Sequence, residues 1–352
     1  MNNDINKDIL YLLNETQIDL DKLDKDDFTD IESKKIKKNF RNSIKKRDKY
    51  YNLKKFVIAA SVIVLSVSFL SSSIGGQIWA NIAIVTKDMA SILGINNDID
   101  KYSTIVNKEI TKHGITVKLN EVILDDDELI VSSSFVSDKK VKDYLISNES
   151  IYVNGKSISS GARGGGIDID EYTRQYVMKN DLSTPISKSD DIDFKIVFDN
   201  IERDGKSIPG NWTFEFKANG SELAKTTQKM NLKQEININK NEKLTLEKYK
   251  RNDLGDKIYF SYNHSRGTLY DIKLTGKDDL GNKVEFYLAS SDKDGGFFEN
   301  ENIESVIDET ATKLTLTPYA VKMPEKSGKM PNDFKKVGEP FTIDLTKLST
   351  SK

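Results

Sequence analysis

The stretch ITVKLNEVILDDDELIVSSSFV, residues 115–136, decides the fold of most of this chain. Apolar and polar residues alternate in it on both sides of three consecutive aspartates, Asp125, Asp126 and Asp127. Alternation with a period of two places successive side chains on opposite faces of a strand, and a polar run between two such segments is typical of a turn. The stretch therefore predicts an antiparallel hairpin with strands at 115–124 and 128–136.

Further segments of the same kind follow along the chain. The clearest is NWTFEFKA (211–218), in which alternation puts Trp212, Phe214 and Phe216 on one face of a strand. The other predicted strands are 150–153, 173–178, 193–199, 231–238, 243–249, 257–262, 268–274, 283–289, 312–319 and 340–345. Their spacing of about 10 to 15 residues, with turn residues between, favours antiparallel sandwiches over a parallel sheet with crossover helices.

Residues 219–230 break the alternation and predict a domain boundary, with a first β-sandwich domain at 101–225 and a second at 226–352. Within the second domain, NDLGDKIYF (252–260) resembles DDLGNKVEF (278–286). Both predict the same turn, in which Gly255 or Gly281 takes a positive φ angle before a strand.

The run from Phe56 to Gly76 carries no charge and is long enough to cross a bilayer as a helix, since about 20 residues suffice. It starts after 55 mostly polar residues, which disfavours a signal peptide. The region 33–55 holds eleven Lys or Arg and one acidic residue, and the basic side of a span stays in the cytoplasm. The sequence predicts a cytoplasmic head (1–55), a transmembrane helix (56–76) and an extracytoplasmic connector helix (77–100). The residues assigned to membrane topology are Lys45, Lys46, Arg47, Lys54, Lys55 and, at the outer interface, Trp79.

An amphipathic helix is predicted at the start of the head. Ile5, Ile9, Leu12 and Leu13 follow helical spacing and form one apolar stripe among acidic residues. We expect this stripe to bind a basic cytoplasmic partner. Alternatively, the basic segment after it is only a topology signal that touches anionic lipid. Nucleic-acid binding is not expected, because acidic residues precede that segment and no groove-reading module is visible.

The sequence contains few arrangements of residues that are typical of catalytic or metal-binding sites. The chain has no Cys, which excludes disulfides and thiolate metal sites, and its two histidines, His113 and His264, fall in different predicted domains. GARGGG (161–166) lacks the residues of a phosphate loop and is expected to be a mobile hairpin loop. The acidic runs 125–128 and 292–294 do not match a calcium loop. We therefore expect no enzyme activity, no catalytic, cofactor or metal residues, and no small-molecule substrate.

Three motifs carry a family resemblance: HGITVKLNEVILDDDELIVSSSF (113–135), IPGNWTFEFKA (208–218) and YDIKLTGKDDLGNKVEFYL with DGGFF (270–298). In these the chain resembles single-pass envelope proteins of low-GC Gram-positive bacteria that carry two consecutive immunoglobulin-like domains of unknown function. The resemblance implies that the outer part of the chain folds into two immunoglobulin-like sandwiches. It also implies that the protein is an anti-sigma factor, which binds an extracytoplasmic-function sigma factor. The head has no His or Cys, so the zinc-binding version of an anti-sigma domain is excluded.

Two functions therefore compete. In the first, the chain lies in the cell membrane with its N-terminus cytoplasmic and its C-terminus outside, and the head holds a sigma factor. An envelope signal then leads to release, with an intramembrane or site-1 type protease as a further partner. In the second, the outer domains are a structural or adhesive module of the cell surface, and the head is only an anchor.

Overall fold

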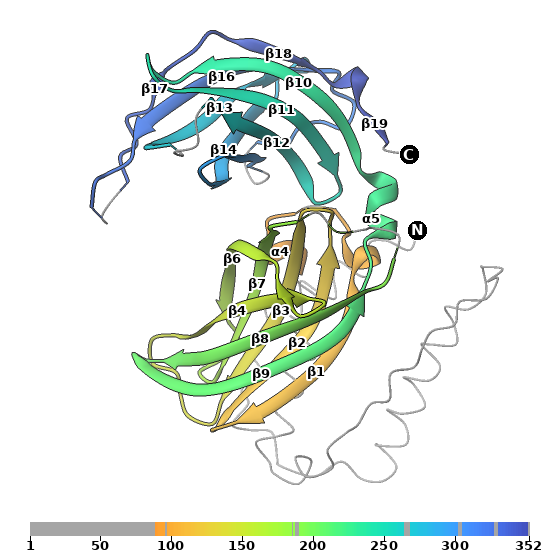
Figure 1. Cartoon of the computed structure of the whole chain (residues 1–352), viewed down its shortest axis with the longest axis vertical. Coiled ribbons are helices and arrows are strands. Elements are labelled where there is room, and N and C mark those ends of the chain that lie inside the picture. Colours follow the sequence, from red (N-terminus) through yellow and green to blue (C-terminus); the bar gives the residue numbers. More distant parts are fainter. Residues whose placement is uncertain are drawn as a thin grey trace, which may run out of the picture. The chain divides into compact units, whose positions relative to one another are not determined.

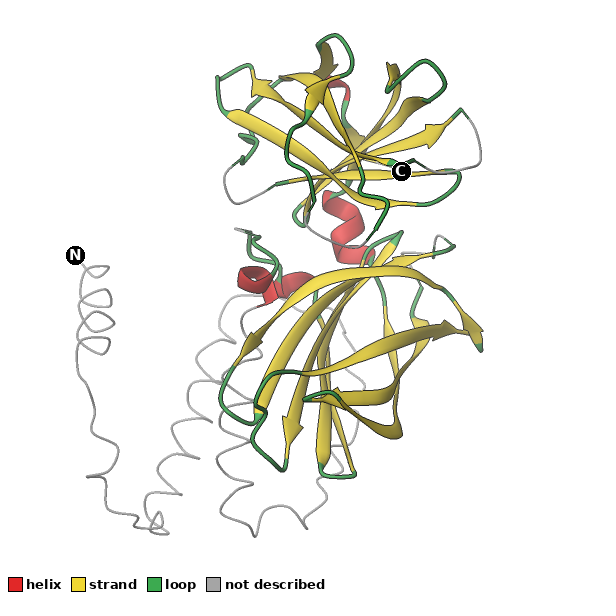
Figure 2. Ribbon diagram, turned by 90° about the vertical axis from the view of Figure 1, so that its left-hand side faces the viewer, coloured by secondary structure: helices red, strands yellow, loops and turns green. Residues whose placement is uncertain are grey.

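A computed structural model describes residues 89–350, apart from positions 96, 185, 187–189, 264–267, 302–304 and 327–329. These residues belong to one compact unit, Val67–Lys352. They are mostly antiparallel β-strands, with short α-helices at α4 (Met89–Ile92) and α5 (Ser221–Thr226) and 3-10 turns at η2 (Asp100–Tyr102) and η3 (Leu345–Lys347) (Figures 1 and 2). No helix in this part of the chain is long and apolar enough to cross a membrane. The predicted head and span lie outside the described residues.

The first β region, Thr104–Ala218, consists of two antiparallel sheets that face each other across one apolar core. The five-stranded sheet has the order β1 (Thr104–Lys112), β2 (Ile115–Leu124), β3 (Glu128–Ser137), β7 (Thr173–Leu182), β6 (Ser159–Asp168). The four-stranded sheet has the order β5 (Lys156–Ser157), β4 (Leu145–Val153), β8 (Ile192–Arg203), β9 (Lys206–Ala218). The hairpin predicted at 115–136 is confirmed as β2 and β3.

The core of the first region follows the alternation of β9. Trp212 and Phe214 are buried and Phe216 is half-buried, whereas Thr213 and Glu215 between them are exposed. The indole N–H of Trp212 donates a hydrogen bond to the carbonyl oxygen of Ile115 across the sandwich (3.3 Å). The predicted inward face of this strand is therefore confirmed.

The second β region, Gln228–Thr350, is one continuous antiparallel sheet around a single core. Its order is β17 (Lys335–Lys336), β16 (Lys313–Lys322), β13 (Tyr270–Asp278), β14 (Lys283–Ser291), β15 (Gly295–Asn300), β12 (Gly255–Tyr262), β11 (Lys243–Asn252), β10 (Gln228–Asn237), β19 (Ser349–Thr350), with β18 (Phe341–Asp344) beside β16. The sequence predicted a sandwich here. Strand β15, which it did not predict, pairs with both β14 and β12 and joins the two halves into one sheet.

The glycine run 161–166 is not a hairpin loop, so that prediction was wrong. It lies in β6, an edge strand that pairs with β7. A side chain at Gly164 would place its Cβ 2.1 Å from the carbonyl oxygen of Val177. Glycine is needed because the neighbouring backbone comes so close, a reason that composition alone does not reveal.

The repeated turn is confirmed. Gly255 and Gly281 have φ angles of +125° and +92°. In each turn the side chain three residues before the glycine, Asn252 or Asp278, accepts a hydrogen bond from the backbone N–H two residues on (3.0 Å in both). The local turn chemistry is thus the same in both places.

The connector helix predicted at 77–100 does not continue through the described residues, because α4 ends at Ile92. Gly94 has a φ of +65°, and the Ile95 N–H bonds the carbonyl oxygen of Ala90 (2.8 Å). This is the pattern of a glycine-terminated helix end, in which the following apolar residue is buried. The described residues from α4 through η2, 89–95 and 97–102, are referred to below as the junction segment.

Candidate functional site

The residues that the sequence assigned to partner binding and membrane topology lie outside the described residues: Ile5, Ile9, Leu12, Leu13, Lys45, Lys46, Arg47, Lys54, Lys55 and Trp79. What the structure brings together instead is a set of buried charges and the junction segment, both in contact with the two β regions. His113 occupies a turn between β1 and β2 with a φ of +52°. His264 is not described.

The acidic turn between β2 and β3 binds a lysine from the second β region. The Lys250 Nζ lies 2.8 Å from Asp125, 3.0 Å from Asp126 and 2.6 Å from Asp127. Its side chain is 1% exposed. Asn252, on the same strand β11, donates a further hydrogen bond to Asp125 (3.1 Å). The predicted hairpin turn is therefore one half of a contact between the regions.

Lys250 and the three aspartates around it are called the turn cluster below. The interactions within this cluster favour the charged forms of all its members except Asp125. Burial would lower the pKa of Lys250, but the carboxylates around it raise that pKa well above its usual value. Burial would raise the pKa of Asp126, but the ammonium groups of Lys250 and Lys229 outweigh it and hold the pKa well below the usual range. Only Asp125, which is fully buried, keeps a raised pKa. Opposite charges this close stabilise each other strongly where water is excluded.

The three aspartates are also close enough to hold a metal ion, with one oxygen from each within 4.8 Å of the others. The Lys250 ammonium lies within 3.0 Å of all three carboxylates. A cation is therefore already supplied by the protein itself, and the donor set fits an ammonium group.

A second group of buried charges continues from Glu128. Its Oε2 lies 2.9 Å from Lys257 Nζ and 2.5 Å from Arg163 Nη2. The same Arg163 Nη2 lies 3.1 Å from Glu299 Oε2, and Lys179 forms an ion pair with Glu299. Arg163 comes from β6 and Lys179 from β7, whereas Lys257 and Glu299 come from β12 and β15. Like the turn cluster, this group links the two β regions with charges that are mostly buried.

Sequence reasoning missed these basic residues. Arg163 was hidden in the glycine run, and Lys250 and Lys257 stand in strands whose alternation predicts only which face they occupy. The sequence offered one signal, the run of three consecutive aspartates. If such a run is buried, it requires cationic partners, because an unpaired buried charge is very costly. That requirement does not identify the partner strand.

The junction segment supplies the apolar part of the site. Met89, Ile95, Ile99 and Tyr102 are buried in one cluster. Its other buried members are Ile123, Ile130 and Val177 from the first β region, Leu223 from α5 and Leu254 from the second. The junction segment is therefore packed against both regions.

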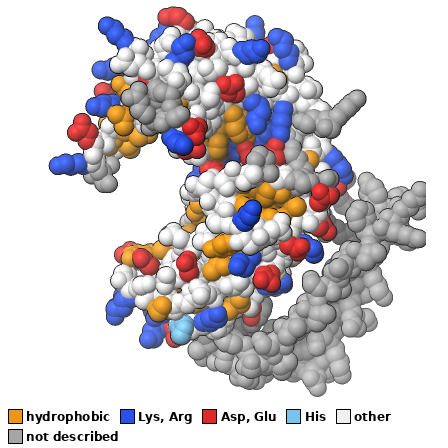
Figure 3. Space-filling view, in the orientation of Figure 1, with side chains coloured by type: hydrophobic (Ala, Val, Ile, Leu, Met, Phe, Trp, Pro, Cys, Tyr) orange, Lys and Arg blue, Asp and Glu red, His pale blue; other side chains and the backbone are white. Residues whose placement is uncertain are grey.

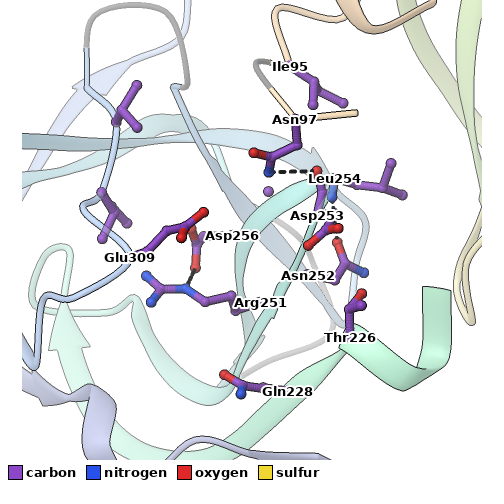
Figure 4. A pocket seen from close by; sticks show the side chains of 13 residues that line it. Ile95, Asn97, Thr226, Gln228, Arg251, Asn252, Asp253, Leu254, Asp256 and Glu309 are labelled. Atoms are coloured by element: carbon purple, nitrogen blue, oxygen red, sulfur yellow. Dashed lines mark hydrogen bonds and ion pairs between the residues drawn. The ribbon is translucent and has the colours of Figure 1, made fainter. Parts of the chain in front are cut away.

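Polar contacts fix the junction segment to the turn before β12. The Tyr102 hydroxyl donates to the Asp253 carboxylate, and Lys101 forms an ion pair with the same carboxylate (2.9 Å). The Asn97 side-chain amide donates to the Asp253 carbonyl oxygen (3.1 Å) (Figure 4). Of the two related turns, this one buries its leucine, since Leu254 is 5% exposed and Leu280 is 56% exposed. The same kind of turn thus packs against the junction segment in one place and is exposed to solvent in the other.

Two family models match the chain. A domain of unknown function, DUF4179, matches residues 45–137, and a family of unknown function, DUF5643, matches residues 227–345. The first match runs from the basic segment through the predicted span and the junction segment to β3. The second coincides closely with the second β region.

Among solved structures, the chain is similar to a conserved domain protein from Bacillus anthracis, known from its crystal structure. The two share 20% identity with a TM-score of 0.53, over 72% of this chain and 94% of that one. At this identity the likeness establishes the fold alone. No curated protein matches the chain. The comparisons thus describe a chain with a mostly β, antiparallel fold and matches to two models of unknown function.

Proposed function

We propose that the chain is a membrane-anchored, anti-sigma factor-like regulator. The head holds an extracytoplasmic-function sigma factor through the stripe of Ile5, Ile9, Leu12 and Leu13. The span crosses the cell membrane with the N-terminus cytoplasmic, the basic segment contacts lipid, and the two β regions, as immunoglobulin-like domains, sense the envelope outside. The protein acts by binding and not by catalysis, and a membrane-associated protease is the releasing partner.

The observation that carries this proposal is the burial of the junction segment. An anchor needs only a tether between its span and its outer domains, and tethers are polar and solvated. Here Met89, Ile95, Ile99 and Tyr102 of the junction segment are packed in an apolar cluster with both β regions. Tyr102 and Lys101 also bind Asp253. A change in how the β regions engage each other must therefore displace the segment that leads towards the span.

The extent of the first family match supports the same view. Residues 45–137 include the basic segment, the apolar run, the junction segment and the first three strands in one pattern. A span fused only for anchoring would not need to share a pattern with the strands that receive it.

The surface of the β regions does not favour a nucleic-acid partner. On the face in Figure 3, Lys and Arg side chains are interspersed with Asp and Glu side chains. A face of mixed sign lacks the continuous positive field that attracts a phosphate backbone.

Capture of the sigma factor from cells tests the proposal. The tagged full chain is cross-linked in membranes, purified, and its cytoplasmic partners are identified by mass spectrometry. We expect a sigma factor with the wild type and its loss with Ile9→Asp and Leu12→Asp together, because charged groups in an apolar groove abolish helix docking.

The matched control reverses charge outside the stripe. Lys45→Glu with Lys46→Glu should alter membrane contact and leave the captured sigma factor in place. If the wild type captures none, or if the stripe variant captures the same proteins, the anchored surface module is the better explanation.

A further inference from the structure

A cavity of about 390 Å³ opens beside the junction segment (Figure 4). This volume is at the lower end of the range for small-molecule sites, about 300 to 1,000 Å³. Its lining comes from the junction segment, from α5 and β10, from the turn between β11 and β12, and from the chain after β15. A ligand in it would therefore touch the junction segment and the second β region at once.

The charges that line this junction cavity leave one carboxylate unpaired. Asp253 is paired with Lys101, and Asp256 is paired with Arg251 (2.7 Å). Glu309, which is exposed at the rim, forms no ion pair within the described part of the chain. The lining itself holds three carboxylates and one cationic side chain, Arg251, so it is negatively charged even with Lys101 beside Asp253.

Part of the remaining wall is aliphatic, and it lies beside the polar side chains of Asn97, Thr226, Gln228 and Asn252. Ile95 and Leu254 lie on one side of the cavity, and Val306 and Ile307 belong to the chain that carries Glu309. Val306 is half exposed, although large aliphatic side chains usually lie inside. Aliphatic side chains beside a carboxylate that has no ion pair among the described residues match a ligand that is cationic at one end and aliphatic along its length.

We propose that the junction cavity binds a small organic cation, a primary ammonium group on a short aliphatic chain. The ammonium group pairs with Glu309, and the chain covers Val306 and Ile307. Binding bridges Asn97 of the junction segment to the second β region and stabilises their contact. As a binding site the cavity stands by itself; as the entry point of an envelope signal it rests on the proposed function.

Hydrogen exchange of the full chain in detergent micelles, read by mass spectrometry, tests this site. The probe is n-butylamine at neutral pH, compared with butyrate and 1-butanol, which have the same chain length but different charge. We expect butylamine to slow exchange in peptides covering residues 97–102, 251–256 and 305–309. Equal protection by all three compounds, or none by butylamine, would overturn the inference.

Two single substitutions sharpen the test. Glu309→Gln should weaken the apparent affinity for butylamine about fivefold, the effect of one partly exposed ion pair. Glu202→Gln, at an exposed glutamate on β8, should leave it unchanged. Equal effects of both variants would mean non-specific binding and would overturn the site. None of these outcomes bears on capture of the sigma factor by the head, so the two proposals fail separately.

Discussion

Replacing Lys250 by Met should destabilise the described unit about as much as removing a large side chain from its core. The substitution removes the ammonium that lies within 3.0 Å of Asp125, Asp126 and Asp127, and the Asp125 side chain is only 3% exposed. Removing one partner of a buried ion pair typically costs about 3 to 5 kcal/mol, because the remaining charge stays buried and unpaired. For a unit of this size that cost corresponds to a fall in Tm of roughly 6 to 20 °C.

The assay is thermal unfolding of the full chain, followed by near-ultraviolet circular dichroism. Lys243→Met is the matched control, since Lys243 lies on the same strand but its ion pair with Glu235 is at the surface (2.8 Å). An exposed pair contributes at most about 1 kcal/mol. Adding Asp125→Asn to Lys250→Met should recover part of the loss. If Lys250→Met lowers Tm no more than Lys243→Met, the buried cluster does not hold the regions together.

The same cluster predicts a pH dependence. Burial would raise the pKa of Asp126 and Asp127, but nearby ammonium groups outweigh burial and hold both below the usual range. A carboxyl group whose pKa is lower in the folded than in the unfolded protein stabilises the fold at any pH above its unfolded pKa, about 3.9 for Asp. This contribution is lost as the pH falls below that value. Wild-type Tm should therefore fall steeply below about pH 4, and Lys250→Met should fall less steeply. Parallel curves would contradict this assignment.

Three other changes have definite outcomes. Trp212→Ala removes the largest buried side chain of the first region and should cost about 3 to 5 kcal/mol in chemical denaturation; an unchanged midpoint would place the indole at the surface. Gly164→Ala forces a Cβ against the Val177 carbonyl oxygen and should cost about 1 to 3 kcal/mol, whereas no cost would mean that β6 does not approach β7 so closely. Burial raises the pKa of Glu149 to about 7, and a hydrogen bond from Asn180 opposes this rise. Because the folded pKa lies above the ordinary value of about 4.5, the stability that the protonated side chain contributes is lost as pH rises from about 4.5 to 7. Glu149→Gln should flatten the pH profile in that window, and a profile identical to wild type would refute the shift.

The strands were predictable where alternation is local. The β2–β3 hairpin and the inward face of Trp212 follow from period-two patterns that each strand carries in its own sequence. The paired turns at Gly255 and Gly281 were predictable for the same reason, because glycine alone tolerates their φ angles easily. Local chemistry determines local structure in all of these places.

The contacts of the candidate site were not predictable, because they depend on which distant segments meet. The role of the acidic turn depends on Lys250, which only the packing of the two β regions brings near. Arg163 was misplaced because its flanking glycines indicate a loop, whereas the approach of β7 requires glycine in a strand. The burial of Leu254 and the exposure of Leu280 make the point most clearly, since the same turn motif has opposite environments.

Chemical cross-linking in native membranes tests most directly whether the junction segment is held by the second β region. A carbodiimide joins an ammonium group directly to a carboxylate that contacts it, so the natural ion pair of Lys101 and Asp253 (2.9 Å) can be tested without a substitution. Lys217 and Asp193, which lie 2.9 Å apart on neighbouring strands, are the reference pair. We expect both pairs to give an intramolecular cross-link, identified by mass spectrometry of tryptic peptides. A cross-link at the reference pair with none between Lys101 and Asp253 would contradict a held junction segment and remove the main support for the proposed regulator.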